Sequence, residues 1–279
     1  MTDTRSNYLN ATESSHINTV RTDTGVAIRP VTDLNGFARC VELQLETWGY
    51  ADSDTIPRRM FLVAQRAGGQ VLGAYDTGAD GGVGHHDNMI GFVLSIPGYR
   101  DGHSYLHSHM LAVLGYWRDR GIGQRLKLAQ RDDALARGID LIEWTFDPLE
   151  IKNAYLNIMK LGAIARRYVA NLYGNSTSVL QGGLPSDRLY AEWWLRSPRV
   201  EAAVRGEAAQ PLQVGKTVKV PGEIYSWRKS ESGRERALDV QTANRFELQA
   251  AFADGLAVTA FSREADGSGS YGLSTWNEE

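Results

Sequence analysis

The stretch HMLAVLGYWRDRGIGQRLKLAQ, residues 109–130, passes from an apolar run through a turn into an amphipathic segment. The apolar run predicts a buried strand that ends near Val113, and apolar residues at helical spacing predict a helix over residues 121–137. The beginning of this helix then lies beside the end of the strand. The turn between them is therefore the first place to look for a binding site.

This turn carries Arg118, Arg120, Gly121 and Gly123. The first N–H groups of a helix have no partner within it and lie at the positive end of the helix dipole, so they attract anions. Glycines let a phosphate approach the backbone, and arginines add charge-assisted hydrogen bonds. The turn lacks the Gly-Lys-Ser/Thr of a P-loop and the G-x-G-x-x-G spacing of a dinucleotide fold. It predicts another kind of anion site; the alternative is a turn whose arginines lie in solvent.

Composition places the chain among globular proteins, with 279 residues, 42% hydrophobic residues and a net charge of -3. That charge excludes a strongly basic nucleic-acid surface, and the length allows one large core or two modest ones. No apolar run reaches about 18 residues, and the start lacks an apolar signal segment. We therefore expect a cytoplasmic protein with no nucleic-acid or membrane partner. The single cysteine, Cys40, falls in an apolar helical pattern and is expected in the core.

Strand and helix patterns follow one another from Val26 to Arg196 and predict an α/β (α+β) fold with a central mixed sheet flanked by helices. The predicted elements are a strand at 26–31, helices at 33–48 and 57–66, strands at 70–77, 89–96 and 104–114, the helix at 121–137, a strand at 138–146, a helix at 148–161, and strands at 163–173 and 188–196.

Three regions are predicted along the chain. Residues 1–25 are polar and predict a disordered tail, and residues 26–205 form the main domain. A linker near residue 205 leads into residues 206–279, a small C-terminal α+β appendix. The appendix is expected to contain a strand, a helix over 234–253 and a hairpin.

The opening stretch resembles the diphosphate-binding motif of the GNAT superfamily of N-acetyltransferases, in which a strand ending in Val precedes R/Q-x-x-G-x-G/A. The resemblance covers roughly residues 26–197. It implies a GNAT fold with a mostly antiparallel sheet, and it makes residues 26–205 an acyltransferase domain. It also implies that acetyl-CoA or another acyl-CoA binds as co-substrate. The expected contacts are the pantetheine arm on Leu111, Ala112 and Val113, and the diphosphate on Arg118, Asp119, Arg120, Gly121, Ile122, Gly123 and Gln124.

A second GNAT-like stretch, NAYLNIMKLGA, begins at Asn153, which the resemblance places in the coenzyme site. Ile158 stands where the family commonly has the tyrosine that protonates the departing thiolate. Tyr155 lies nearly one helical turn earlier, and Asn157 is also close enough to reach the sulfur. Tyr155 is therefore the candidate proton donor; the alternative is a packing role.

The strings LHSHML, WTFDPL and KLGA, with a later DRL and Trp193, resemble a bacterial subgroup of predicted GNAT acetyltransferases, some of which are associated with N-succinylation of amino acids. The resemblance implies an acyl-CoA-dependent N-acyltransferase that passes an acetyl or succinyl group to the amine of a small molecule such as an amino acid. Two rival functions stay open: a catalytically silent acyl-CoA-binding or sensing module, and an acyl-CoA decarboxylase or hydrolase. A homodimer is compatible with the sequence, which does not set the oligomeric state.

Amine acylation needs a group that accepts a proton, and histidine suits that task near neutral pH. Five of the six histidines fall within residues 85–109. His107 and His109 alternate along the predicted strand, so both are expected on one face, and His109 is the first candidate base. Many family members have a glutamate close to the position of Met110, whose side chain is expected on the other face together with Ser108. Glu143 and Asp147 are the acidic alternatives.

The polar residues allow two further interpretations. His107 and His109 with His103 could bind a metal if a carboxylate joined them, but the spacing is not specific and acyl transfer requires no metal, so no metal is expected. Arg166 and Arg167 could recognise a carboxylate on the acceptor or on a succinyl group. We expect them instead on a solvated face.

Overall fold

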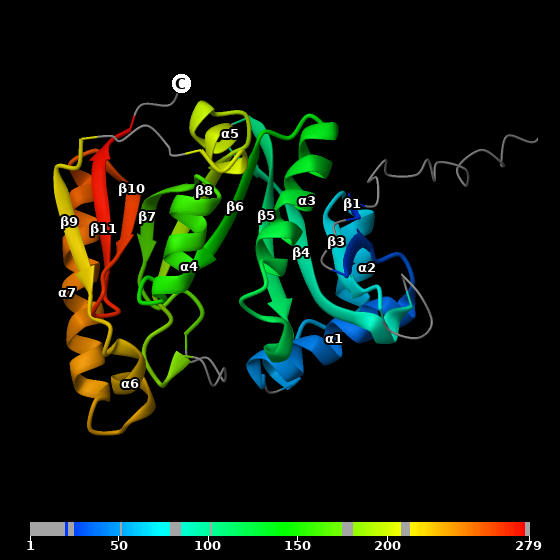
Figure 1. The fold of residues 1–279 in the computed structure, drawn as a ribbon, viewed down its shortest axis with the longest axis horizontal. Coiled ribbons are helices and arrows are strands. Elements are labelled where there is room, and N and C mark those ends of the chain that lie inside the picture. The colour runs from blue at the N-terminus through cyan, green and yellow to red at the C-terminus, as the bar shows by residue number, and fades with distance from the viewer. Residues whose placement is uncertain are drawn as a thin grey trace, which may run out of the picture.

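This computed structural model describes residues 20–21, 25–50, 52–78, 85–100, 102–174, 181–207 and 213–276. These residues form one eleven-stranded sheet in the order β1-β2-β3-β4-β5-β6-β8-β7-β10-β11-β9 (Figure 1). Every neighbouring pair is antiparallel except β5 and β6, which are parallel. The predicted mixed, mostly antiparallel sheet is confirmed. No described helix is long and apolar enough to cross a membrane.

The elements that precede the β5–β6 junction form a sheet with α1 and α2 on one face, and α3 covers the other face. In chain order they are β1 (Val20–Arg21), β2 (Val26–Pro30), α1 (Leu34–Trp48), η1 (Asp52–Asp54), α2 (Arg58–Arg66), β3 (Gln70–Asp76), η2 (His86–Asn88), β4 (Met89–Arg100) and β5 (His103–Val113). Asp33 caps α1 by accepting hydrogen bonds from two backbone N–H groups. Cys40 is fully buried against α2 and the sheet, as predicted.

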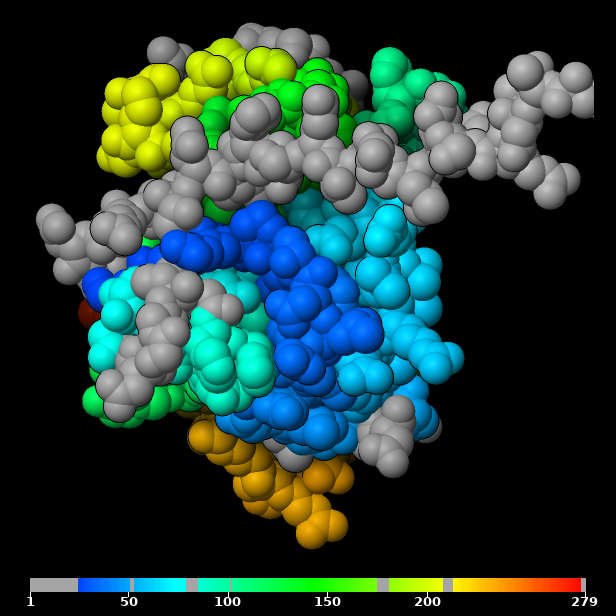
Figure 2. Space-filling view, turned by 90° about the vertical axis from the view of Figure 1, so that its right-hand side faces the viewer, coloured from blue at the N-terminus to red at the C-terminus, as the bar shows by residue number. Residues whose placement is uncertain are grey.

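Alternate residues of these strands pack on opposite faces of the sheet. Phe92 and Ala112 belong to the core under α1 and α2, whereas Val93 and Val113 belong to the core under α3. Figure 2 shows this end of the molecule, where the N-terminal elements, in blue shades, lie together on the surface. The predicted tail, residues 1–25, lies almost entirely outside the described residues, although Val20–Arg21 pair with β2.

The central elements continue the sheet beyond β5. They are η3 (Gly115–Trp117), α3 (Ile122–Ala136), β6 (Leu141–Phe146), α4 (Ile151–Tyr155), a π-helical turn η4 (Leu156–Lys160), β7 (Ile164–Val169), β8 (Arg188–Trp194) and α5 (Pro198–Val204). Helices α3 and α4 lie in front of the sheet in Figure 1. The predicted strand at 163–173 is shorter in the structure, because the chain turns after Val169.

The C-terminal elements extend the same sheet. They are β9 (Lys216–Val220), α6 (Ile224–Lys229), α7 (Arg234–Ala253), β10 (Leu256–Arg263) and β11 (Gly269–Thr275). Strand β10 pairs with β7 through Val258 and Ala165. Val258 and Tyr271 share one hydrophobic core with Leu189 and Trp193 of the central region. Helix α7 has the predicted bounds; the division of the chain into domains near residue 205 stays a prediction.

Buried ion pairs also join the C-terminal elements to the centre of the chain. Arg228 of α6 donates to Asp147 at 2.7 Å and to Glu150 at 2.9 Å. Arg245 of α7 donates to Asp187, whose side chain is fully buried. A buried carboxylate without a partner is costly, so each of these arginines stabilises the central region as well as its own helix.

Replacing Arg228 with methionine is expected to lower the free energy of unfolding by about 3–5 kcal/mol, because Asp147 and Glu150 lose their guanidinium partner. Arg196→Met is the matched control, since Arg196 pairs with Asp140 at the surface and such pairs contribute about 0–1 kcal/mol. Urea unfolding measures both variants. Equal losses would contradict a stabilising role for the buried pair.

Candidate active site

Strands β5 and β6 are paired over a short length and then separate. Their parallel register consists of Leu106 with Ile142 and His107 with Glu143. Beyond this point, residues 108–113 of β5 pair with β4, and residues 144–146 of β6 pair with β8. Among the described residues, the edge of β5 that faces β6 therefore has no strand partner after His107. An exposed strand edge can accept another extended chain through main-chain hydrogen bonds.

The open strand edge leads directly to the beginning of α3. Gly121 precedes the helix with a φ of 75°, and no side chain caps the first turn. The first helical hydrogen bond runs from the N–H of Arg125 to the carbonyl of Gly121, at 3.1 Å. The N–H groups of residues 122–124 therefore have no partner within the helix. A Cβ built on Gly121 meets nothing within 4 Å, so the space in front of these groups is open.

Charged side chains surround this turn. Arg118 donates from Nε to the carbonyl of Val113 at 3.1 Å and so holds the end of β5. The guanidinium of Arg120 lies over the rings of Tyr116 and Trp117, at 4.8 and 4.9 Å. Arg120 also lines a small cavity of about 210 Å³ together with Val26, Trp117, Ile122 and Arg125. The predicted anion-binding residues are thus together at one turn.

Residues at the site of the candidate base are arranged by a β-bulge. Leu94 pairs with Met110 and Ser95 with Ser108, so His109 is the extra residue on β5. Met110 packs against the core under α1 and α2, whereas Ser108 bonds to side chains of α3. The prediction that Met110 and Ser108 share a face is therefore wrong. A strict two-residue alternation does not hold across a bulge.

His107 and His109 lie near each other, with ring centroids 6.1 Å apart. Burial, and after it the neighbouring His109, lower the pKa of His107 to about 4. Burial also lowers the pKa of His109. Both imidazoles are therefore neutral at pH 7, which is the form that accepts a proton. The predicted pair is placed where β5 and β6 separate.

Lys127 of α3 is a buried residue at this junction that is not among the residues predicted for the site. Its Nζ donates to Ser108 Oγ at 2.8 Å and lies 3.7 Å from the ring centroid of Trp144 on β6. Complete burial lowers the pKa of this amine well below its usual range. The sequence does not indicate that Lys127 is buried, because a lysine within an amphipathic helix usually lies on the solvent face.

Five charged residues form a cluster beside the histidines, here called the ion-pair cluster: Arg100, Glu143, Arg166, Arg167 and Glu192. Glu143 accepts from Arg100 at 2.5 and 3.1 Å and from Arg167 at 2.9 Å. Arg166 donates to Glu192 at 2.7 Å. The expectation that Arg166 and Arg167 lie on a solvated face is wrong, because two buried glutamates hold them.

The acidic alternatives to a histidine base are both engaged in ion pairs. Both carboxylate oxygens of Glu143 accept hydrogen bonds from arginines, and Asp147 bonds to Arg228 and to the N–H of Leu149. Carboxylate oxygens that already accept hydrogen bonds from guanidinium groups are less available to accept one from a substrate. The geometry therefore favours the histidines over Glu143 and Asp147.

Tyr155 lines a cavity of about 530 Å³ between α4 and the C-terminal hairpin, and neither His107 nor His109 lines this cavity. The cavity is lined by Ile151, Lys152, Tyr155, Tyr225, Arg263, Glu264 and Gly267. The guanidinium of Arg263 lies 4.0 Å from the centroid of the Tyr155 ring. Asn153 is exposed on α4, and Asn157 is buried in the π-helical turn.

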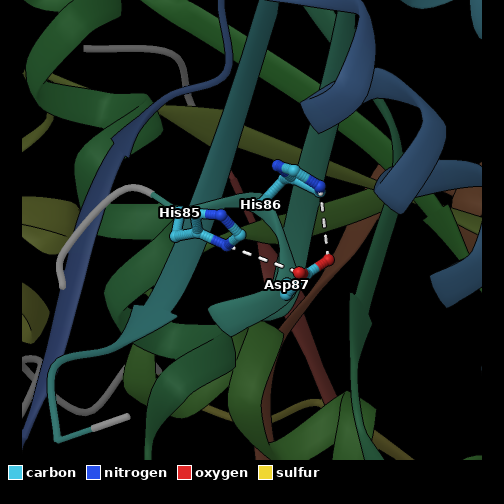
Figure 3. Close-up of side chains that lie close together, drawn as sticks. All are labelled: His85, His86 and Asp87. Atoms are coloured by element: carbon cyan, nitrogen blue, oxygen red, sulfur yellow. Dashed lines mark ion pairs between the residues drawn. The ribbon is translucent and has the colours of Figure 1, made fainter. Parts of the chain in front are cut away.

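The described residues contain one group with the spacing of metal ligands, and it differs from the histidines considered as a metal site in the sequence. His85, His86 and Asp87 are consecutive surface residues whose ligand atoms lie within 4.8 Å of one another (Figure 3). Asp87 pairs with His85 at 3.5 Å and with His86 at 3.3 Å. These three neighbours on a short surface turn are remote in sequence from His107 and His109, and nothing in the proposed chemistry uses them.

The architecture is that of the GNAT fold, as the sequence resemblance implies. A mostly antiparallel sheet contains one parallel pair that separates, and a helix begins at a glycine turn next to the open strand. No family model and no curated protein sequence matches the chain.

Solved structures that resemble this chain include Arabidopsis thaliana NAA60 in complex with acetyl-CoA, at 13% identity and a TM-score of 0.48, covering 61% of this chain and 99% of that one. Another is the ribosomal-protein-S18-alanine N-acetyltransferase from Escherichia coli, at 12% identity and a TM-score of 0.43, covering 60% and 92%. A third is a putative GNAT-family acetyltransferase from Desulfovibrio desulfuricans, at 13% identity and a TM-score of 0.46, covering 61% and 99%.

Proposed function

We propose that the chain is an acyl-CoA-dependent N-acyltransferase of the GNAT superfamily, which passes an acetyl or succinyl group to the amine of a small molecule such as an amino acid. The observation that carries this proposal is the open edge of β5 beside the uncapped beginning of α3. The pantetheine arm of coenzyme A has two amides that can pair with a strand edge. Its diphosphate suits the free N–H groups of residues 122–124.

The adenosine end of the coenzyme is proposed to lie at the cavity next to α4. Lys152 contacts Asp119 of the glycine turn at 3.2 Å and also lines the cavity that contains Tyr155 and Arg263. The 3′-phosphate of coenzyme A needs cationic partners, which Lys152 and Arg263 supply. In this cavity Tyr155 is better placed to contact the adenosine than to protonate the departing thiolate, because the sulfur lies at the other end of the extended coenzyme.

The proposed chemistry takes place where β5 and β6 separate. The neutral amine nitrogen attacks the thioester carbonyl, the C–N bond forms, and the C–S bond breaks to release the thiolate. His109 is proposed to accept the proton from the amine, with His107 beside it. Main-chain N–H groups of the open strand edge can stabilise the charge that develops on the carbonyl oxygen. This route requires no metal.

Release of free thiol from acetyl-CoA and succinyl-CoA, with and without a panel of amines, tests the proposed function. Thiol release that depends on an added amine supports the transferase. Release without an amine would instead indicate a hydrolase or decarboxylase, and tight binding without release would indicate a silent binding module. Failure to bind either thioester in a calorimetric titration would overturn all three.

Arg263→Ala is expected to weaken binding of coenzyme A by about tenfold, because a charge-assisted hydrogen bond to phosphate contributes about 1.5–3 kcal/mol. The affinity for 3′-dephospho-coenzyme A should not change, since it lacks the phosphate that Arg263 contacts. Arg236→Ala, at an exposed position on α7, is the control. If both coenzyme forms lose affinity equally, Arg263 does not bind the 3′-phosphate.

A further inference from the structure

Lys127 is a buried lysine that forms no ion pair with any carboxylate of the described residues. It is 5% exposed. Within the described part of the chain, its Nζ donates one hydrogen bond, to Ser108 Oγ at 2.8 Å, and lies 3.7 Å from the ring centroid of Trp144. Burying an amine with so few partners costs stability, whereas an apolar side chain of similar length would avoid that cost. An amine at this position therefore needs a reason other than the stability of the fold.

The Lys127 amine lies where β5 and β6 begin to separate. The last pair of their parallel register is His107 with Glu143. Ser108 and Trp144 are the next residues on the two strands, and both contact Nζ. Helix α3, which carries Lys127, lies in front of this part of the sheet (Figure 1). Lys127 therefore joins the two strands at the first position where they no longer pair with each other.

Ser108 is also held by a second residue of α3. Its hydroxyl donates to Gln130 Oε1 at 3.0 Å while it accepts from Lys127. The main-chain carbonyl of Gln130 accepts from Gln70 Nε2 at 2.9 Å, and Gln70 Oε1 accepts from Ser95 at 2.9 Å. Ser95 is the partner of Ser108 across β4 and β5. All five residues are 0–5% exposed, so α3 holds both members of this pair through a buried polar network.

This network borders the β-bulge that carries His109. Ser95 and Ser108 form the pair on one side of the bulge, and Leu94 and Met110 form the pair on the other side. The extra residue of a bulge has no partner in the ladder, so its direction depends on how the flanking residues are held. By fixing Ser108, α3 fixes the backbone from which the His109 imidazole extends.

We propose that Lys127 is a positioning residue, which through Ser108 holds the bulge, and with it the His109 imidazole, where His109 accepts the proton of the acceptor amine. The proposal rests on the proposed function, in which His109 is the base. Lys127 acts here without touching either substrate. Displacing a reacting group by about 1 Å can cost about a hundredfold in rate, so a single hydrogen bond that sets its position has a large effect.

Lys127→Met tests this proposal, because it removes the amine and keeps a side chain of similar length. We expect kcat to fall about tenfold or more, while KM for the acyl-CoA stays within about twofold. The urea midpoint of unfolding should stay the same or rise, since an apolar group replaces a buried amine. Lys229→Met, at an exposed position on α6, is the control for loss of one positive charge. A wild-type kcat in Lys127→Met would overturn the proposal.

A double-mutant cycle distinguishes positioning of His109 from a general structural role. If Lys127 acts through His109, the Lys127→Met substitution should change kcat by less than about twofold once His109 has been replaced with alanine. A residue that only supports the fold would lower kcat by the same factor in both backgrounds. Equal losses with and without His109 would therefore contradict the positioning role.

A measurement without turnover separates this inference from the proposed function. In protein labelled with isotopes in its histidines, the NMR signals of the His109 ring, assigned with His109→Ala, should shift in both Lys127→Met and Ser108→Ala. The signals of His103, which is exposed at the start of β5, should not shift. If no amine increases thiol release, the transferase proposal fails, and these signals still decide whether Lys127 positions His109. His109 signals that stay unchanged in either variant would overturn the inference.

Discussion

Replacing Gly121 with glutamate is expected to reduce acyl-CoA affinity at least a hundredfold. The new carboxylate would lie in front of the N–H groups of residues 122–124, where it would repel the diphosphate and compete for the same donors. Gly121 also has a φ of 75°, so any side chain there costs about 1 kcal/mol in backbone strain. Calorimetric titration with acetyl-CoA and succinyl-CoA measures the loss.

Gly138→Glu is a close control for this variant. Gly138 follows the other end of α3, has a φ of 73°, and a Cβ built there also meets nothing within 4 Å. The two variants therefore share the backbone strain and the added charge, and differ in which end of the helix they modify. If Gly121→Glu binds acyl-CoA as well as Gly138→Glu does, the turn is not the diphosphate site.

His109→Ala is expected to lower kcat by about 10²–10⁴ while leaving acyl-CoA affinity within about twofold, because a positioned base contributes that much to proton transfer. If His109 is the base, His107→Ala should lower kcat less than His109→Ala does, because His107 lies beside the base without accepting the proton itself. Assays of thiol release measure turnover, and calorimetric titration measures acyl-CoA binding, so the two effects can be separated. Near-normal turnover in His109→Ala would remove it as the base.

The pH dependence of the wild type provides a second measurement. Only the neutral imidazole accepts a proton, and burial lowers the pKa of both His107 and His109 below 6.5. With the rate expressed per neutral acceptor amine, activity should therefore persist to lower pH than an exposed histidine would allow, and fall as the pH passes below the lowered pKa of the base. If His107 were the base, this fall would lie near pH 4. In the rate corrected in this way, an acid limb above pH 6.5 would contradict both assignments.

The sequence predicted the elements of the fold well because their signals are local. Asp33 caps α1, apolar residues mark the buried strands, and helix α7 has the predicted bounds, whereas the short helix α5 was not predicted. The glycine turn could also be predicted, since a backbone with positive φ, as at Gly121, favours glycine. These features depend on neighbours within one or two helical turns.

The site around the histidines was harder to predict because it depends on the register of distant strands. Two β-bulges, at His109 and Arg166, change which side chains share a face. Arg100, Glu143 and Arg167 are far apart in sequence and meet only when β4, β6 and β7 are placed in one sheet. The buried Lys127 likewise has no local signal. Site residues whose role arises from pairing across the sheet were therefore mispredicted or missed.

The pairing of Asp147 with Arg228 and of Asp187 with Arg245 has a consequence for synthesis on the ribosome. Both carboxylates emerge well before the arginines that balance their charge. Until Arg245 has been translated, burial of the charged Asp187 would lack its guanidinium partner. We therefore expect the central sheet to reach its full stability only after α7 has been translated.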